Sequence, residues 1–355
     1  MTVSPTLRRR VVPAVGGWPA HVPPLLQRLY AARGVASAEA AELKLARMLA
    51  PAQLGGIDAA VDLLESAISR DAHLVVVGDF DCDGATGTAV AVRGLRMLGA
   101  RRVSYRVPHR IAHGYGLSPA LVEDELAPIA PEVVITVDSG IACLPGVAAA
   151  KAHGWQVLVT DHHLPGDELP EADAIVNPNL RGDGFPSKAL AGVGVMFYLL
   201  LALRARLRER GAAGGDADLS SLLDLVAVGT VADLVMLDDN NRLLVAAGLK
   251  RLREGCGQPG VLALAEVAGK RLPMLTATDI GFGIGPRINA AGRREDMTLG
   301  SSTRSTRSVA SCSSRWSTRR KPPRWPCRCP RAVTTRTACS MPRGIRASSD
   351  WSHRS

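Results

Sequence analysis

Aspartate occupies every second position directly after a short apolar run. The run extends from Leu74 to Val77, and the aspartates are Asp79, Asp81 and Asp83. A β-branched run of this length is typical of a buried strand in a parallel sheet. In an open α/β sheet, the loops beyond the carboxyl ends of the strands form the ligand crevice. Three carboxylates there repel one another unless a cation compensates them, and hard divalent metal ions suit that role.

Two further apolar runs, at residues 133–137 and 156–160, also end in acidic or imidazole side chains. A later segment supplies a fourth candidate. Carboxylates with one or two histidines suit Mn²⁺ or Mg²⁺ better than zinc. Two such ions, about 3.5–4 Å apart, form the usual clamp for phosphoester hydrolysis. The side chains concerned are Asp138, Asp161, His162, His163 and Asp233.

Each motif also has a simpler structural interpretation. An Asp after a strand is often a helix N-cap or a turn residue, which applies to Asp138 before Ser139 and Gly140. For Asp161 this interpretation is stronger, because a strand-end Asp can simply orient a neighbouring histidine. A histidine pair on a loop is commonly a solvated surface feature. The three clusters in order, taken together, favour the metal site.

The motifs extend beyond these strand ends and carry a resemblance to a known family. They lie at residues 78–86, 108–110, 114–117, 137–140, 160–163, 229–235 and 285–293. On these segments the chain resembles the DHH family of phosphoesterases, whose defining triplet is seen here as Asp161-His162-His163. Within the family it is similar to the RecJ-type single-strand DNA exonucleases, over roughly residues 35–300. The segments at 114–117, 229–235 and 285–293 are much more typical of the RecJ type than of small DHH phosphatases.

The resemblance implies a site that binds two ions of Mn²⁺ or Mg²⁺. Asp81 or Asp138 would bridge the two ions. Asp79 would adjust the electrostatics around the metal ligands or activate the attacking water, and His163 would face the scissile phosphate. The complete set of implied metal ligands is Asp81, Asp83, Asp138, His162 and Asp233.

Several other side chains in these motifs suit contacts with the substrate. Arg110, Arg287 and Arg293 can make bidentate phosphate contacts, although each could instead be solvated or structural. Asn289 would act as a neutral donor beside them. Tyr115 can stack on a base, which is the commonest sequence-independent contact to single strands.

The net charge of +10 and the pI near 9.7 favour a nucleic-acid partner. The net positive charge is, however, confined to the C-terminal segment. Residues 301–355 contain twelve Arg and one Lys against the single acid Asp350, and thus carry a net charge of +12. The first 300 residues therefore carry −2. Any DNA affinity of these 300 residues would come from individual arginines near the site and not from an overall positive electrostatic potential.

The C-terminal segment 301–355 differs from the body in composition. It contains thirteen Ser and four of the seven Cys, but no Leu, Glu, Phe or Tyr. Such a composition predicts disorder, and an RNA- or DNA-binding tail is one interpretation. We favour another, translation of a GC-rich gene in a shifted frame. On that hypothesis the chain is a truncated, impaired RecJ-type enzyme without the second α/β domain of the family.

The pattern predicts a doubly wound, mainly parallel α/β sheet followed by a helical part. The expected divisions are an N-terminal helical segment (1–70), the catalytic DHH domain (71–235), a helical continuation (236–300) and the tail (301–355). Residues 281–292 are expected to form a glycine-rich loop around Arg287. Helices are expected at 37–49, 57–70, 86–98, 144–153, 189–210, 219–229 and 239–254, and a further strand at 103–107.

Cysteine usage and hydropathy bear on location. Cys82, Cys143 and Cys256 lack metal-ligand spacing, which fits a reduced cytosolic protein. No apolar run approaches the roughly 18 residues of a membrane span, and the N-terminus is not typical of a signal peptide. We therefore expect a cytoplasmic protein without membrane association.

The resemblance implies a single-stranded-DNA-specific 5′-to-3′ exonuclease of DNA repair and recombination. A helicase and a single-strand-binding protein are the candidate protein partners. One alternative is a small DHH phosphoesterase acting on short oligonucleotides or nucleotide phosphates. A second is an inactive scaffold that binds nucleic acid or protein. Every expected ligand is present, which argues against the inactive scaffold.

Overall fold

The computed structural model describes residues 11–13, 16–35 and 37–292. The predicted disordered, out-of-frame tail lies outside the described residues, and so does Arg293. The domain boundaries expected near residues 70, 235 and 300 stay predictions.

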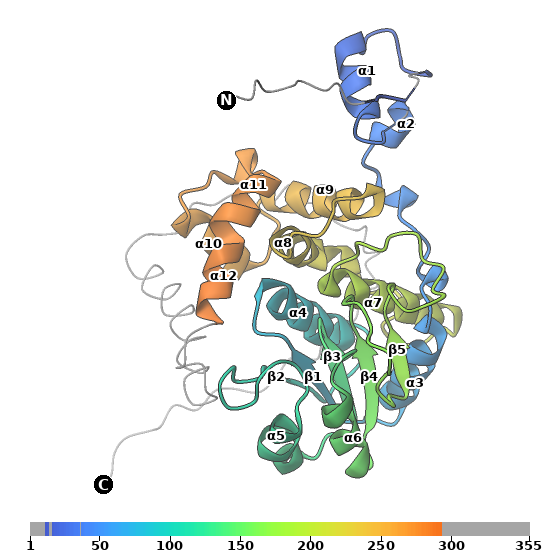
Figure 1. The fold of residues 1–355 in the computed structure, drawn as a ribbon, viewed down its shortest axis with the longest axis vertical. Coiled ribbons are helices and arrows are strands. Elements are labelled where there is room, and N and C mark those ends of the chain that lie inside the picture. The colour runs from blue at the N-terminus through green and yellow to red at the C-terminus, as the bar shows by residue number, and fades with distance from the viewer. Residues whose placement is uncertain (1–10, 14–15, 36, 293–355) are drawn as a thin grey trace, which may run out of the picture.

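A single sheet of five parallel strands lies in the lower half of the body as drawn in Figure 1. Its spatial order is β2-β1-β3-β4-β5. Four strands were expected from their apolar runs, whereas the short edge strand β5 was not. The bounds are β1 Leu74–Gly78, β2 Val103–Arg106, β3 Val133–Val137, β4 Gln156–Thr160 and β5 Ala174–Val176.

Helices cover both faces of the sheet, so the expected doubly wound architecture is confirmed. Alternate strand residues point to opposite faces, and Leu74 and Val76 belong to one buried core while Val75 and Val77 belong to the other. The first core is shared with α3 (Ile57–Ser69), α4 (Cys82–Met97) and α7 (Gly192–Glu209). The second is shared with α5 (Pro119–Leu121) and α6 (Leu144–Ala152).

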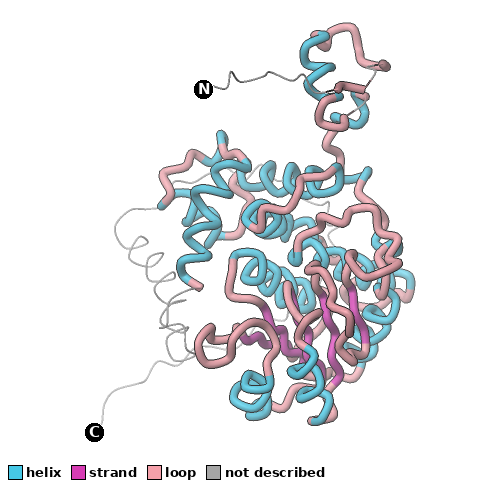
Figure 2. Tube along the Cα trace, viewed as in Figure 1, coloured by secondary structure: helices cyan, strands magenta, loops and turns pink. Residues whose placement is uncertain are grey.

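The later part of the described chain is helical, as expected, and forms the upper part of the body in Figure 2, above the strands. Helix α8 packs along α9, and α8 also contacts α4 of the first core. Among the described helices, none combines the length and the apolar character that a bilayer span requires. The bounds are α8 Leu223–Ala232, α9 Asp239–Arg253, α10 Pro259–Val267, α11 Ala277–Asp279 and α12 Gly285–Ala291.

The prediction of a glycine-rich loop at residues 281–292 is wrong, because this segment is helical. A wide turn (Ile280–Ile284) leads into α12, and Pro286 lies in the first helical turn, where its missing N–H is not needed. Gly285 packs so closely that a Cβ there would lie 2.9 Å from Cβ of Ala232. Tertiary packing therefore outweighs the low helix propensity of the glycines.

The helix expected at residues 37–49 is much shorter than predicted. Ser37 caps it as expected, accepting a hydrogen bond from the N–H of Ala40 at 3.2 Å. The helix is α2 (Ala38–Ala41), and it contributes no buried residue. Short helices gain most of their stability from packing, so α2 ends after one turn. Helices α1 (Pro24–Ala31) and α2 stand apart from the body in Figure 1.

Candidate metal centre

The predicted strand-end residues meet at one edge of the sheet. Strand β1 lies between β2 and β3, so the strand order reverses at the β1–β3 pair. In doubly wound sheets the ligand crevice forms beyond the carboxyl ends of the strands at such a reversal. Asp79 follows β1, Asp138 follows β3, and the triplet that begins with Asp161 follows β4.

The aspartates after β1 lie in a tight turn that leads directly into α4. Asp79 is buried and accepts the N–H of Phe80 at 2.7 Å. Asp81 is the N-cap of α4 and accepts the N–H of Gly84 at 2.9 Å. The helix starts four residues earlier than predicted, so Asp83 lies in its first turn and not in a loop. Asp81 thus serves as a cap and is also a candidate ligand.

Asp138 adopts the left-handed backbone conformation, with φ of +60°. This conformation is costly for most residues other than glycine, and it concentrates at functional sites. The hydroxyl of Tyr115 donates to the Asp138 carbonyl oxygen at 3.0 Å, which helps to hold the turn. The Asp138 carboxylate is buried.

Asp161 orients the two histidines, which is the role that its position after a strand suggested. Its Oδ1 lies 2.7 Å from Nδ1 of His163 and also accepts the backbone N–H of His162 at 2.7 Å. Two residues that the sequence analysis missed support the same loop: the side-chain amide of Asn177 donates to the His163 carbonyl, and that of Asn179 to the His162 carbonyl. Both residues follow β5. Polar side chains directly after a strand were the signal that identified Asp79, Asp138 and Asp161, and the same signal would have identified these two asparagines if β5 had been predicted.

His162 lies at the centre of the cluster. Its Nε2 is 3.1 Å from Oδ1 of Asp138, 3.6 Å from Oδ2 of Asp233 and 4.0 Å from Oδ2 of Asp83. Asp233 comes from the C-terminal end of α8 and not from a strand. Three groups have ligand atoms that all lie within 4.8 Å of one another: Asp138–His162–His163, Asp83–His162–Asp233 and Asp79–Asp81–Asp138.

Burial and neighbouring negative charges disfavour the ionised forms of Asp79, Asp83 and Asp138. Burial raises the pKa of Asp79 to about 6. Burial, together with the neighbouring acidic charges, raises the pKa of Asp83 and of Asp138 well above the usual range. Burial would also raise the pKa of Asp161, but its hydrogen bonds from His163 and Ile141 outweigh that effect and lower it.

The donor set fits a pair of divalent ions. Within the described residues, the buried atoms Oδ1 of Asp138 and Nε2 of His162 have no hydrogen-bond partner, although they lie close together. A bound cation would satisfy both lone pairs. Oxygen donors with one or two imidazoles suit Mn²⁺ or Mg²⁺.

Aromatic rings and a guanidinium lie beside the carboxylates. The Tyr115 ring makes edge contacts with Phe80 and His163, at centroid distances of 6.1 and 6.2 Å. The Arg110 guanidinium stacks over Phe80 at 4.5 Å from the ring centroid. Tyr115 is 46% exposed, so its ring is available to a ligand.

Two other residues predicted to contact the substrate, Asn289 and Arg287, make hydrogen bonds within the protein. The Asn289 Oδ1 accepts the N–H of Cys82 at 2.6 Å, which anchors α12 to the start of α4. Arg287 is exposed and donates to the Gly283 carbonyl within its own helical segment. The donor role expected of Asn289 stays a prediction, because it would use the amide N–H groups and not the oxygen that accepts from Cys82.

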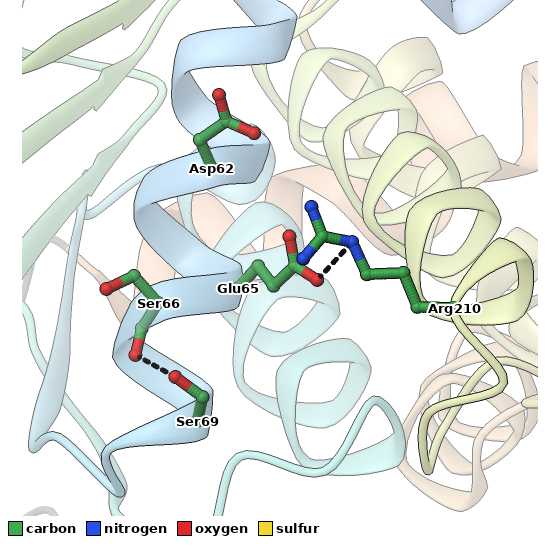
Figure 3. Close-up of a pocket in the computed structure, with 5 residues that line it drawn as sticks. All are labelled: Asp62, Glu65, Ser66, Ser69 and Arg210. Carbon is green, nitrogen blue, oxygen red and sulfur yellow. Dashed lines mark hydrogen bonds and ion pairs between the residues drawn. The ribbon is translucent and has the colours of Figure 1, made fainter.

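A pocket of about 500 Å³ lies elsewhere on the body (Figure 3). Asp62, Glu65 and two serines of α3 line it, with Arg210 at the C-terminal end of α7. Helix α7 has 18 residues and begins beside the carboxylates, so its far end is roughly 27 Å away. The pocket is therefore separate from the carboxylate cluster.

The fold and the cluster together define a DHH domain, and the model of the "DHH family, N-terminal domain" matches residues 73–230. A single-stranded-DNA-specific exonuclease RecJ from Salmonella typhimurium is 53% identical over 298 residues, which are 83% of this chain and 52% of that protein. The chain belongs to the RecJ branch of the DHH family. It spans about half the length of the curated RecJ proteins of Salmonella typhimurium and Escherichia coli, which are 53% and 52% identical to it.

Two solved structures show the same likeness. One is described as exonuclease RecJ bound to manganese; it has a TM-score of 0.62 and 36% identity, over 76% of this chain and 68% of that one. The other is RecJ from Thermus thermophilus in complex with Mn²⁺, with a TM-score of 0.61 and 34% identity, over 81% of this chain and 41% of that one.

Proposed function

We propose that this chain hydrolyses phosphodiester bonds of single-stranded DNA from the 5′ end, as a two-metal exonuclease of DNA repair and recombination. The observation that carries the proposal is the buried cluster in which Asp138 and His162 hold unpaired ligand atoms, as far as the described residues go. The relatives named as single-stranded-DNA-specific exonucleases support the substrate, and the manganese-bound relative supports the ion. The 5′ polarity rests on the family resemblance.

The proposed metal ligands come from four segments of the chain. Asp138 is part of two of the three compact ligand groups, which favours it over Asp81 as the bridging ligand. When bound, two ions of Mn²⁺ or Mg²⁺ would neutralise the scissile phosphate and lower the pKa of the attacking water. The proposed set is Asp81, Asp83, Asp138, His162 and Asp233.

Two groups beside the ligands are suited to hold protons. Asp79, with a pKa of about 6, can accept a proton near neutral pH, and we assign it to the activation of water. The hydrogen bond to Asp161 raises the pKa of His163, although burial opposes the shift. His163 therefore stays protonated to higher pH and can donate to a phosphate oxygen.

The proposed substrate contacts are Arg110, Tyr115, Arg287, Asn289 and Arg293. Tyr115 is the best supported, because its exposed ring lies against His163. We further propose that a helicase and a single-strand-binding protein supply the substrate. We place the enzyme in the cytoplasm, where thiols such as those of the buried Cys82 and Cys143, which form no disulfide with any described residue, stay reduced.

The test uses single-stranded and duplex oligonucleotides of roughly 5 to 60 nucleotides, a range that extends well beyond a single-strand site of about 4–16 nucleotides. They are labelled at either end and incubated with Mn²⁺, Mg²⁺ or EDTA. We expect metal-dependent release of nucleotides from the 5′ end of single strands, and its loss in Asp81→Ala. Cleavage of the shortest substrates alone would instead favour the small-substrate phosphoesterase. Binding of DNA without metal-dependent cleavage would favour the inactive scaffold.

A further inference from the structure

Two helices present a glycine to a carboxylate of the cluster at very close range. A Cβ added to Gly192, the first residue of α7, would lie 2.5 Å from Oδ1 of Asp138 and 2.6 Å from its Cβ. A Cβ added to Gly229 in α8 would lie 2.7 Å from Oδ1 of Asp83 and 2.3 Å from Oγ1 of Thr86. These carboxylates therefore occupy the space that a side chain at either position would need.

The same turn of α7 also holds Asp83 through its backbone. The N–H of Gly192 donates to Oδ2 of Asp83 at 2.7 Å, and the N–H of Val193 donates to Oδ1 at 3.0 Å. The N-terminal end of a helix carries partial positive charge, which stabilises a carboxylate there. Gly192 thus contacts two carboxylates at once, Asp83 through its N–H and Asp138 through its Cα.

We propose that Gly192 and Gly229 are positioning residues that set where the Asp138 and Asp83 carboxylates stand relative to His162. The inference rests on the proposed two-metal function, to which it adds two residues that bind no ion themselves. A methyl group at Gly192 would push Asp138 out of its place 3.1 Å from Nε2 of His162. A methyl group at Gly229 would displace Asp83 from the N–H groups of α7.

The chain offers matched controls in which a glycine is equally crowded but faces no carboxylate. A Cβ at Gly194, also in α7, would lie 2.6 Å from Cδ1 of Leu190. A Cβ at Gly94, in α4, would lie 2.3 Å from Cδ1 of Leu200. These variants cost helix packing without touching the cluster. If Gly192 and Gly229 are needed only because helices pack closely there, the control variants should behave in the same way. If the carboxylates matter, only the variants at Gly192 and Gly229 should affect metal binding.

The experiment measures Mn²⁺ binding by electron paramagnetic resonance and thermal unfolding in EDTA, for Gly192→Ala, Gly229→Ala, Gly194→Ala and Gly94→Ala in the full chain. We expect Gly192→Ala and Gly229→Ala to weaken Mn²⁺ binding by about 10- to 100-fold, the range for groups that support metal ligands. The two controls should lower the unfolding temperature and keep the wild-type affinity. Equal loss of affinity in all four variants, or in none, would overturn the proposal.

A double-mutant cycle tests the same contact without metal. Asp138→Gly removes the carboxylate that the new methyl group would meet, and glycine suits the positive φ at this position. Gly192→Ala should therefore destabilise the wild type, or unfold it, but be tolerated in the Asp138→Gly background. Equal destabilisation in both backgrounds would refute the positioning role. Wild-type protein that binds no Mn²⁺ would refute the proposed function, while this cycle would still decide the contact.

Discussion

The Nε2 atom of His162 and the Oδ1 atom of Asp138 lie 3.1 Å apart, and among the described residues neither has a hydrogen-bond partner. Buried polar atoms are rarely left unpaired, because each lost hydrogen bond costs about 1–3 kcal/mol. Here both atoms are ligand types for a divalent cation, and further carboxylates surround them. The pair is therefore understandable as half of an ion-binding site, and not as a defect of packing.

Replacing Asp138 with Asn should weaken metal binding and stabilise the metal-free protein. Asn has nearly the same shape and tolerates the left-handed conformation, but it removes one of several mutually repelling charges. Loss of a residue that only supports a metal ligand lowers metal affinity by about 10- to 100-fold. Because Asp138 is proposed to be a ligand itself, we expect Mn²⁺ affinity to fall by at least about that factor. Calorimetric titration with Mn²⁺ and thermal unfolding in EDTA measure the two effects.

The control for this variant is Asp167→Asn, because the Asp167 side chain is 98% exposed and pairs only with an exposed Arg181 among the described residues. It should change neither quantity. An Asp138→Asn protein with wild-type affinity would show that Asp138 is not a metal ligand.

Without metal, the protein should lose stability as the pH rises from about 4 to about 6. Burial raises the folded-state pKa of Asp79 to about 6, above the value of about 4 in the unfolded chain, so the folded state binds more protons in this window. The raised pKa values of Asp83 and Asp138 act in the same direction. Burial lowers the pKa of His73, which opposes the trend at higher pH.

Chemical denaturation in EDTA at a series of pH values measures this effect, and Asp79→Asn should reduce the slope. Saturating Mn²⁺ should reverse the trend, because protons compete with the metal for the same carboxylates. A metal-free stability that rises steadily between about pH 4 and pH 6 would contradict the assignment of these pKa shifts.

Replacing Asp161 with Asn should slow DNA cleavage and lower the pKa of His163. The charged carboxylate accepts from Nδ1 of His163 at 2.7 Å and stabilises the protonated ring. We expect cleavage to slow by about 10- to 100-fold, as for other residues that orient functional histidines. The ring resonances of His163, followed by NMR against pH, measure the shift directly.

Asp173→Asn provides a comparison for that variant, because Asp173 accepts the backbone N–H of Val157 and pairs with Lys151 instead of a histidine. It should leave the His163 titration unchanged. An Asp161→Asn protein with a wild-type His163 pKa would show that Asp161 only shapes the loop.

Tyr115 should contribute to single-strand binding through its ring, not its hydroxyl. Tyr115→Phe removes the hydrogen bond to the Asp138 carbonyl, which should cost about 0.5–1.5 kcal/mol of stability. Tyr115→Ala also removes the stacking surface and should cost about 1–3 kcal/mol of single-strand affinity. Fluorescence anisotropy with labelled oligonucleotides in EDTA measures binding apart from cleavage. Equal DNA affinity of the Phe and Ala variants would exclude a stacking role.

Much of the fold could be read from local patterns. The runs at 74–77, 133–137 and 156–160 are strands because continuous β-branched apolar residues suit a sheet that is buried on both faces. Since parallel strands end at the same edge, the sequence also predicted that Asp79, Asp138 and His162 would approach one another. The RecJ branch of the DHH family was recognisable from the same motifs.

Other features depend on contacts between segments that are far apart in the chain. Asp233 reaches His162 only because α8 packs against α4, and residues 281–292 are helical only because they pack on that same part of the body. The contact of Gly192 with Asp83, 109 residues away, has no local signature. Local propensity and periodicity determine which residues form strands and turns. The distances between their side chains are decided by close packing, which no single segment of the sequence contains.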